Sequence, residues 1–103
     1  YGASTKGNVL LQYCGFTCED IPAIAEVNQD KFGCYTPHTL IPIASEDDVS
    51  AMKPDFMLVL PWHFRENIIS REHEYLNSGG VLIFPLPHIS CESAITIREQ
   101  RIA

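Results

Sequence analysis

The stretches Phe56-Met57-Leu58-Val59-Leu60 and Val81-Leu82-Ile83-Phe84 are continuous apolar runs of strand length, each followed by a proline, Pro61 or Pro85. A strand that is covered on both faces has no polar side, so runs of this kind are typical of the buried strands of a parallel sheet. Residues 23–27, Ala-Ile-Ala-Glu-Val, are a shorter third candidate. We therefore expect at least three short strands.

Helical patterns lie between these candidate strands. The clearest runs from Phe64 to about Asn77, with its apolar residues near one face, and Gly79-Gly80 supplies its stop. A shorter helix is predicted over Glu46–Met52, because Ser45 is a good N-cap and the acidic residues that follow suit the positive end of a helix.

At the front of the chain, residues 8–14 predict an apolar helix that ends at Gly15. Helices that alternate with buried strands imply right-handed crossovers. The predicted fold class is therefore α/β, a doubly wound three-layer sandwich with a mostly parallel sheet, whose first strand would end near Tyr1. Residues 32–43 carry Pro37 and Pro42 and match no element.

Size and charge limit the functions that are open to the chain. Its 103 residues suit one domain, and its net charge of -6 comes without a basic stripe, which disfavours nucleic acid as a partner. No apolar run approaches the roughly 20 residues that span a bilayer, and the start lacks the pattern of a secretory signal. We expect a single domain over residues 1–103 that acts in the cytoplasm and contacts no membrane.

The cysteines are Cys14, Cys18, Cys34 and Cys91, and no two of them form a Cys-x-x-Cys pair. This spacing gives little support to a metal site. We expect reduced and mostly buried thiols, because a free cysteine behaves as a small hydrophobic residue.

Residues 2–8, Gly-Ala-Ser-Thr-Lys-Gly-Asn, lie where a doubly wound fold places its ligand loop, between a strand and a helix N-terminus. They match neither the dinucleotide fingerprint nor the P-loop, so NAD and ATP are poorly supported. Two interpretations stay open. Backbone N–H groups with Ser4, Thr5 and Lys6 could bind a diphosphate, or the glycines could merely allow a tight turn.

Pro61-Trp62-His63-Phe64 follows a later strand and should lie on the same carboxyl edge of the sheet. Trp62 could stack on a base or sugar and His63 could exchange a proton. The plainer alternative, which the residues favour, is that Trp62 packs against a domain and His63 caps the helix. His38 is best interpreted as a loop residue.

Glu26 stands about twenty residues after the glycine turn, where a dinucleotide-binding domain would place its ribose-binding acid. Without the fingerprint, the default interpretation is a solvated strand end. No Ser-His-Asp order, carboxylate pair or metal cluster can be defended from spacing, so no catalytic residue is predicted.

Three ordered segments together resemble the C-terminal domain of the sugar C-methyltransferase family. They are Tyr1-Gly2-Ala3-Ser4-Thr5-Lys6-Gly7-Asn8 with Leu10-Leu11 and Tyr13-Cys14-Gly15; Asp30-Lys31-Phe32-Gly33 through Thr36-Pro37 to Ile41-Pro42-Ile43; and Lys53-Pro54-Asp55 through Leu60-Pro61-Trp62. The likeness covers about residues 1–87 and leaves a tail at 88–103. Many members have glycine where this chain has His38.

The resemblance implies a larger parent protein. Members combine a zinc-binding N-terminal domain, a central S-adenosylmethionine-binding domain and a Rossmann-like C-terminal domain, and this chain matches only the last. The full enzymes remove a proton beside the ketone of a nucleotide-linked deoxysugar, and the resulting enolate attacks the methyl sulfonium. S-adenosylmethionine and zinc would then bind in the other domains, with no cofactor and no metal in this one.

For this chain, the resemblance implies a module that holds the nucleotide-linked deoxy-ketosugar against the central domain. The positions that would carry this substrate-binding role are Gly2, Ala3, Ser4, Lys6, Gly7 and Asn8, with a contribution from Trp62 and His63. The alternative is a non-catalytic regulatory or scaffolding domain that keeps the fold and binds no ligand.

Overall fold

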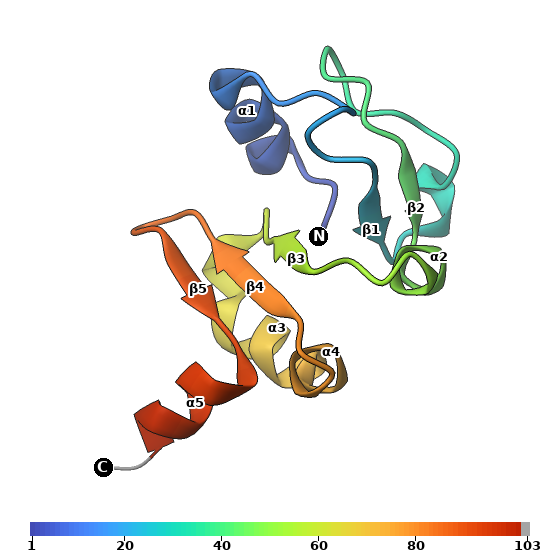
Figure 1. Cartoon of the computed structure of the whole chain (residues 1–103). Helices are drawn as coiled ribbons and strands as arrows, with labels where there is room; N and C mark the ends of the chain where they lie inside the picture. Colours follow the sequence, from blue (N-terminus) through green and yellow to red (C-terminus); the bar gives the residue numbers. More distant parts are fainter. Residues whose placement is uncertain (102–103) are drawn as a thin grey trace. The chain divides into compact units, whose positions relative to one another are not determined.

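The computed structural model describes residues 1–101, with side chains as far as residue 97. The chain is a mixed α/β protein with two small sheets (Figure 1). Its contacts divide it into two compact units, Tyr1–Lys53 and Pro54–Ala103. We call these unit 1 and unit 2.

The sheet of unit 1 is a parallel pair of short strands, β1 (Ile24–Glu26) and β2 (Ile43–Ser45). The extended segment before the first helix joins this sheet through the Gly2 N–H, which donates to the Ala25 carbonyl at 2.8 Å. The strand expected over residues 23–27 is confirmed. Sequence analysis missed β2, because three residues that run directly into a helix carry no strand periodicity.

Two helices belong to this unit, α1 (Thr5–Cys14) and α2 (Glu46–Ala51), with a 3-10 turn, η1 (Gln29–Lys31), between β1 and β2. Gly15 ends α1 in the left-handed conformation at φ 71°, as expected from its sequence. Ser45 closes β2 and also caps α2, because its hydroxyl accepts from the Asp48 N–H at 3.1 Å. The core of unit 1 consists of Leu11, Ile24, Ala25, Ile41, Ile43 and Val49.

The unassigned stretch at residues 32–43 is a tight hairpin-like loop, in which Tyr35 and Pro42 form an antiparallel bridge. Thr36 is its buried centre, and the hydroxyl of Thr36 accepts from the Ile41 N–H at 2.9 Å. His38 lies at the tip with φ 65°, in the left-handed region. Glycine adopts that conformation without steric cost, whereas a histidine carries strain there.

The sheet of unit 2 has the order β3-β4-β5, with β3 (Phe56–Leu58) parallel and β5 (Ser90–Glu92) antiparallel to β4 (Val81–Phe84). The expectation that both apolar runs are covered on both faces is wrong. Phe56 is 65% exposed, and burial in β4 alternates between half-buried and fully buried residues. Antiparallel pairing with a tail strand gives β4 a covered and a more open face.

The helical stretch of unit 2 is broken rather than continuous. It comprises a 3-10 turn, η2 (Trp62–Phe64), then α3 (Arg65–Arg71) and α4 (His73–Asn77), separated at Glu72. Phe64 is exposed, so the expected apolar face begins at Ile68 instead. Nothing in the structure explains the break at Glu72. The stop at Gly79 is confirmed by its positive φ of 101°.

The tail after residue 87 adds β5 and a final helix, α5 (Ala94–Arg101). The Glu92 side chain is buried beneath it and forms an ion pair with the Arg65 guanidinium, which also donates to the Ser90 hydroxyl at 3.0 Å and lies over the Phe84 ring at 4.6 Å. Thr96 donates its hydroxyl to Glu92 at 3.0 Å. The tail is therefore fastened to α3 by polar contacts.

These findings confirm a mixed α/β chain with parallel strand pairs. A single three-layer sandwich with a mostly parallel sheet stays a prediction, because the described strands form one parallel pair and one mixed sheet. In the part of the chain that the structure describes, no helix has the length and apolarity needed to cross a membrane.

The expectation of mostly buried cysteines is wrong. All four thiols, Cys14, Cys18, Cys34 and Cys91, are free and exposed. Three of them lie in the last turn of α1 or in loops, and Cys91 faces away from the buried side of β5, on which its neighbour Glu92 lies.

Gly80 packs under the Tyr75 ring, and a Cβ at that position would meet three ring carbons at less than van der Waals contact. The ring is held there because the Tyr75 hydroxyl donates to the Pro54 carbonyl at 3.0 Å. We predict that Gly80→Ala lowers the free energy of unfolding by about 1–3 kcal/mol, as overpacking does. Urea denaturation measures this. In a Tyr75→Leu background the same substitution should cost less, and an equal cost in both backgrounds would refute the clash.

His38 provides a second test of the backbone. Because a non-glycine residue at φ 65° carries steric strain, His38→Gly should raise the free energy of unfolding by about 0.5–1 kcal/mol, net of the greater freedom of glycine in the unfolded chain. His38→Asn should be close to neutral and His38→Val destabilising, since asparagine tolerates this region and β-branched residues do not. Equal stabilities of the Gly and Val variants would contradict the prediction.

Candidate functional site

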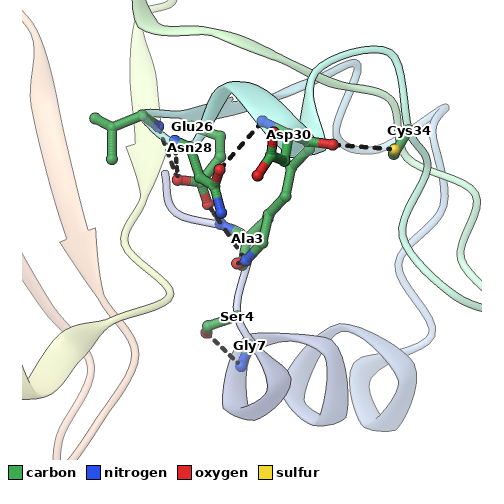
Figure 2. A network of polar contacts seen from close by, with 9 residues as sticks. Ala3, Ser4, Gly7, Glu26, Asn28, Asp30 and Cys34 are labelled. Atoms are coloured by element: carbon green, nitrogen blue, oxygen red, sulfur yellow. Dashed lines mark hydrogen bonds and ion pairs between the residues drawn. The ribbon is translucent and has the colours of Figure 1, made fainter.

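The turn before α1 is held by hydrogen bonds within unit 1 (Figure 2). The Gly2 N–H donates to the Ala25 carbonyl of β1, and the Ala3 N–H donates to Glu26 Oε1 at 3.0 Å. Ser4 is the N-cap of α1, and its hydroxyl accepts from the Gly7 N–H at 3.1 Å. The donors predicted to meet a diphosphate at Gly2, Ala3 and Gly7 are therefore already engaged.

Glu26 is a buried carboxylate at the end of β1, 9% exposed. Its Oε1 accepts from Ala3, while its Oε2 accepts from the N–H groups of Val27 at 2.7 Å and Asn28 at 3.1 Å. The interpretation of Glu26 as a solvated strand end is wrong, because the chain turns back on the carboxylate directly after the strand.

Lys31 adds a positive charge beside this carboxylate. Its Nζ lies 3.9 Å from Glu26 Oε1 and donates to the Ala3 carbonyl at 2.7 Å. The residue comes from η1, which begins where the Asn28 side chain accepts from the Asp30 N–H at 3.1 Å. Glu26 and Lys31 thus hold the N–H and the carbonyl of Ala3, one from each side.

These contacts determine the protonation of Glu26. Burial alone would raise its pKa, but the N–H groups of Asn28, Val27 and Ala3, together with the Lys31 ammonium, outweigh that effect. The pKa of Glu26 therefore lies below its ordinary value, and the group is an anion at neutral pH. Its charge is compensated within unit 1.

The first turn of α1 has a different character. Thr5 and Lys6 are exposed, and among the described residues neither side chain has a hydrogen-bond or ion-pair partner. Asn8 comes directly after Gly7, and its Oδ1 is a buried acceptor without a hydrogen-bond partner in the described part of the chain. The exposed side chains of Thr5 and Lys6 are therefore the polar groups of this turn that remain available to a ligand.

Trp62 and His63 lie in η2, shortly after β3 in unit 2. The two rings meet edge to face at 6.0 Å, and the exposed His63 ring lies 4.3 Å from that of Phe64. The expectation that His63 caps the helix is wrong, because Phe64 occupies the N-cap position of α3 and no side chain makes a cap hydrogen bond there. The imidazole is open to solvent.

The predicted site residues fall in both units. Gly2, Ala3, Ser4, Lys6, Gly7 and Asn8 belong to unit 1, and Trp62 and His63 to unit 2. Their expected position at one common sheet edge stays a prediction. Among the side chains described, those of residues 1–97, no group of three His, Cys, Asp or Glu is arranged to hold a metal ion.

Sequence analysis did not identify Lys31 and Asn28 as partners of the turn. The contact joins residues that are 28 positions apart in the chain, and no local pattern encodes it. A signal did exist for Glu26, whose spacing from the glycine turn matches that of a ribose-binding acid. In the structure, the Glu26 carboxylate at that position accepts hydrogen bonds from the backbone instead.

Comparison with known proteins places these features in a family. The sequence model of the C-methyltransferase C-terminal domain matches residues 1–87, which include the glycine turn, Glu26 and the η2 aromatics. The chain is also 38% identical over 98 residues to the C-methyltransferase NovU of Streptomyces niveus. The aligned residues cover 92% of this chain but 23% of the relative. The chain therefore spans about a quarter of the length of that protein.

The lowered pKa of Glu26 leads to a pH prediction. A carboxylate whose pKa falls on folding contributes stability above its unfolded value of about 4.3, and this stability is lost as the pH drops through the lower folded value. Urea denaturation should show Glu26→Gln to be less stable than the wild type by about 1–2 kcal/mol at pH 7.

The gap in stability between wild type and Glu26→Gln should narrow progressively as the pH falls below about 4, because Glu26 then becomes protonated first in the unfolded and finally in the folded protein. Glu19→Gln is a suitable control, since Glu19 is an exposed carboxylate of the same unit. A gap for Glu26→Gln that stays constant from pH 7 to pH 3 would contradict the assignment.

Proposed function

Because this chain belongs to the C-methyltransferase C-terminal domain family, we propose that it serves a methyltransferase as the module that holds a nucleotide-linked deoxy-ketosugar. In this proposal the methyl group comes from S-adenosylmethionine bound by a central domain of the same parent protein, and this chain contacts that domain. The reaction would take place in the cytoplasm, and the isolated chain would not catalyse it.

The observation that carries the proposal is the contrast between the two halves of the turn. The backbone donors before α1 are consumed internally, whereas Thr5 and Lys6 are exposed at the positive end of the helix. A diphosphate would meet the Lys6 ammonium, the Thr5 hydroxyl and the first-turn N–H groups there.

In this proposal Gly2, Ala3, Ser4 and Gly7 support the site rather than touch the ligand. Gly2 and Ala3 are fixed by β1 and Glu26, and Ser4 with Gly7 starts the helix. Trp62 and His63 would contribute an aromatic face and a polar group at the strand end of unit 2. Trp62 could stack on a base or sugar there.

Neither cofactor of the parent reaction suits the described residues. An adenosine ribose bound in the manner of a dinucleotide fold needs an accepting carboxylate, and both oxygens of Glu26 are occupied by the backbone. A structural zinc ion needs four ligands, usually cysteine and histidine, and no cluster of even three suitable side chains occurs among the described side chains of residues 1–97. We propose that S-adenosylmethionine and zinc bind in other domains of the parent protein.

The test is a titration of the chain with a dTDP-linked 4-ketosugar, followed by calorimetry and by amide NMR shifts in the first turn of α1. Lys6→Gln should weaken binding about tenfold, since a hydrogen bond to a charged group is worth about 1.5 kcal/mol or more. Lys53→Gln removes the same charge from an exposed lysine of unit 1 and should leave the affinity within about twofold. Absence of heat and of NMR shifts in the wild type would refute binding by this chain.

The internal use of the glycine-turn donors also favours a second candidate, a non-catalytic scaffolding or regulatory domain that binds no ligand. In the full-length protein this candidate predicts that Lys6→Gln leaves the rate of methyl transfer and its dependence on sugar concentration unchanged. The binding proposal instead predicts a raised KM for the nucleotide-linked sugar with little change in kcat.

A further inference from the structure

The Glu26 carboxylate fills a nest of positive groups that unit 1 builds from its own chain (Figure 2). The nest consists of the N–H groups of Ala3, Val27 and Asn28, at 2.7–3.1 Å from the carboxylate oxygens, and the Lys31 ammonium at 3.9 Å. Its members come from the turn before α1, the end of β1 and η1. Three chain segments therefore meet around one anion.

Such a nest needs an anion to accept from its N–H groups. Converging backbone N–H groups form an anion-binding concavity, whatever molecule supplies the anion. Buried donors that lose their acceptor cost the full penalty of desolvation. Removing the Glu26 carboxylate would leave the three N–H donors with nothing but water to accept from them, and the Lys31 ammonium without its anion.

We propose that Glu26 is the built-in anion of this nest and a positioning residue for the turn before α1, and that the nest binds a small exogenous carboxylate when the side chain is shortened. The removed atoms define the ligand. Glu26→Ala deletes a CH₂ and a carboxylate, which is the size of acetate, whereas Glu26→Gly deletes the equivalent of propionate. The proposal concerns unit 1 itself and does not depend on nucleotide-sugar binding.

The lowered pKa of Glu26 is consistent with this role, because the surroundings favour the charged form despite burial. Lys31 also takes part in holding the turn before α1. Its Nζ also donates to the Ala3 carbonyl, so the anion and the cation hold successive polar groups of one residue. An acetate in the nest would restore both contacts to the turn.

The experiment is thermal unfolding of the 103-residue chain followed by circular dichroism. Glu26→Ala should lower Tm by about 5–10 °C, and sodium acetate should restore at least half of that loss in a saturable manner. Sodium chloride at equal ionic strength should not. Propionate should act better on Glu26→Gly than on Glu26→Ala. In the wild type and in Glu26→Gln the side chain fills the nest, so acetate should change Tm no more than chloride does.

Equal responses of Glu26→Ala to acetate and chloride, or an acetate response of the same size in the wild type, would overturn the proposal. If neither shortened variant folds, the positioning role of Glu26 is tested in Glu26→Gln by NMR measurement of amide exchange and chemical shifts. Its Ala3 amide should exchange faster with solvent than in the wild type, and the Ala3, Val27 and Asn28 amide protons should shift together. Unchanged exchange at Ala3 would overturn the positioning role, with Glu19→Gln as the unaffected control.

Discussion

The buried carboxylate of Glu26 links parts of unit 1 that are distant in sequence. Through its two oxygens it ties the segment that enters α1 to the end of β1 and to the start of η1. Lys31 completes the link from the other side of Ala3. The direction in which α1 leaves the sheet, and hence the position of Thr5 and Lys6, depends on this one charged group and its donors.

Much of the local structure could be predicted from the residues. The apolar runs at 56–60 and 81–84 became strands, and Ser45 and Gly15 marked helix ends, because propensity and capping act over a few neighbouring residues. The pairing of β4 with a tail strand joins segments that are distant in the sequence. Periodicity contains no information about such contacts, so Phe56 and the cysteines were expected to be buried and are exposed.

The turn at the start of α1 was predicted from the sequence, but its hydrogen bonds were not, and its role as a binding site stays a prediction. Residues 2–8 do form a turn at a helix N-terminus, and the family match covers them. The sequence could not show that the N–H groups of Ala3 and Gly7 donate to the side chains of Glu26 and Ser4, because those side chains could equally accept from other donors. The structure therefore shifts the binding hypothesis from the glycines to the exposed side chains of Thr5 and Lys6. Methyl transfer itself is a property of the family and of the larger relative that this chain partly spans.

The exposed thiols have a practical consequence for measuring movement. Cys14, Cys18 and Cys34 lie on unit 1 and Cys91 on unit 2, all outside the two cores. Spin labels or fluorescent dyes could therefore be attached to one remaining thiol in each unit, after the others are replaced by serine, without disturbing either core. The distance between two such probes would report how the units move relative to each other in solution, with and without a sugar nucleotide.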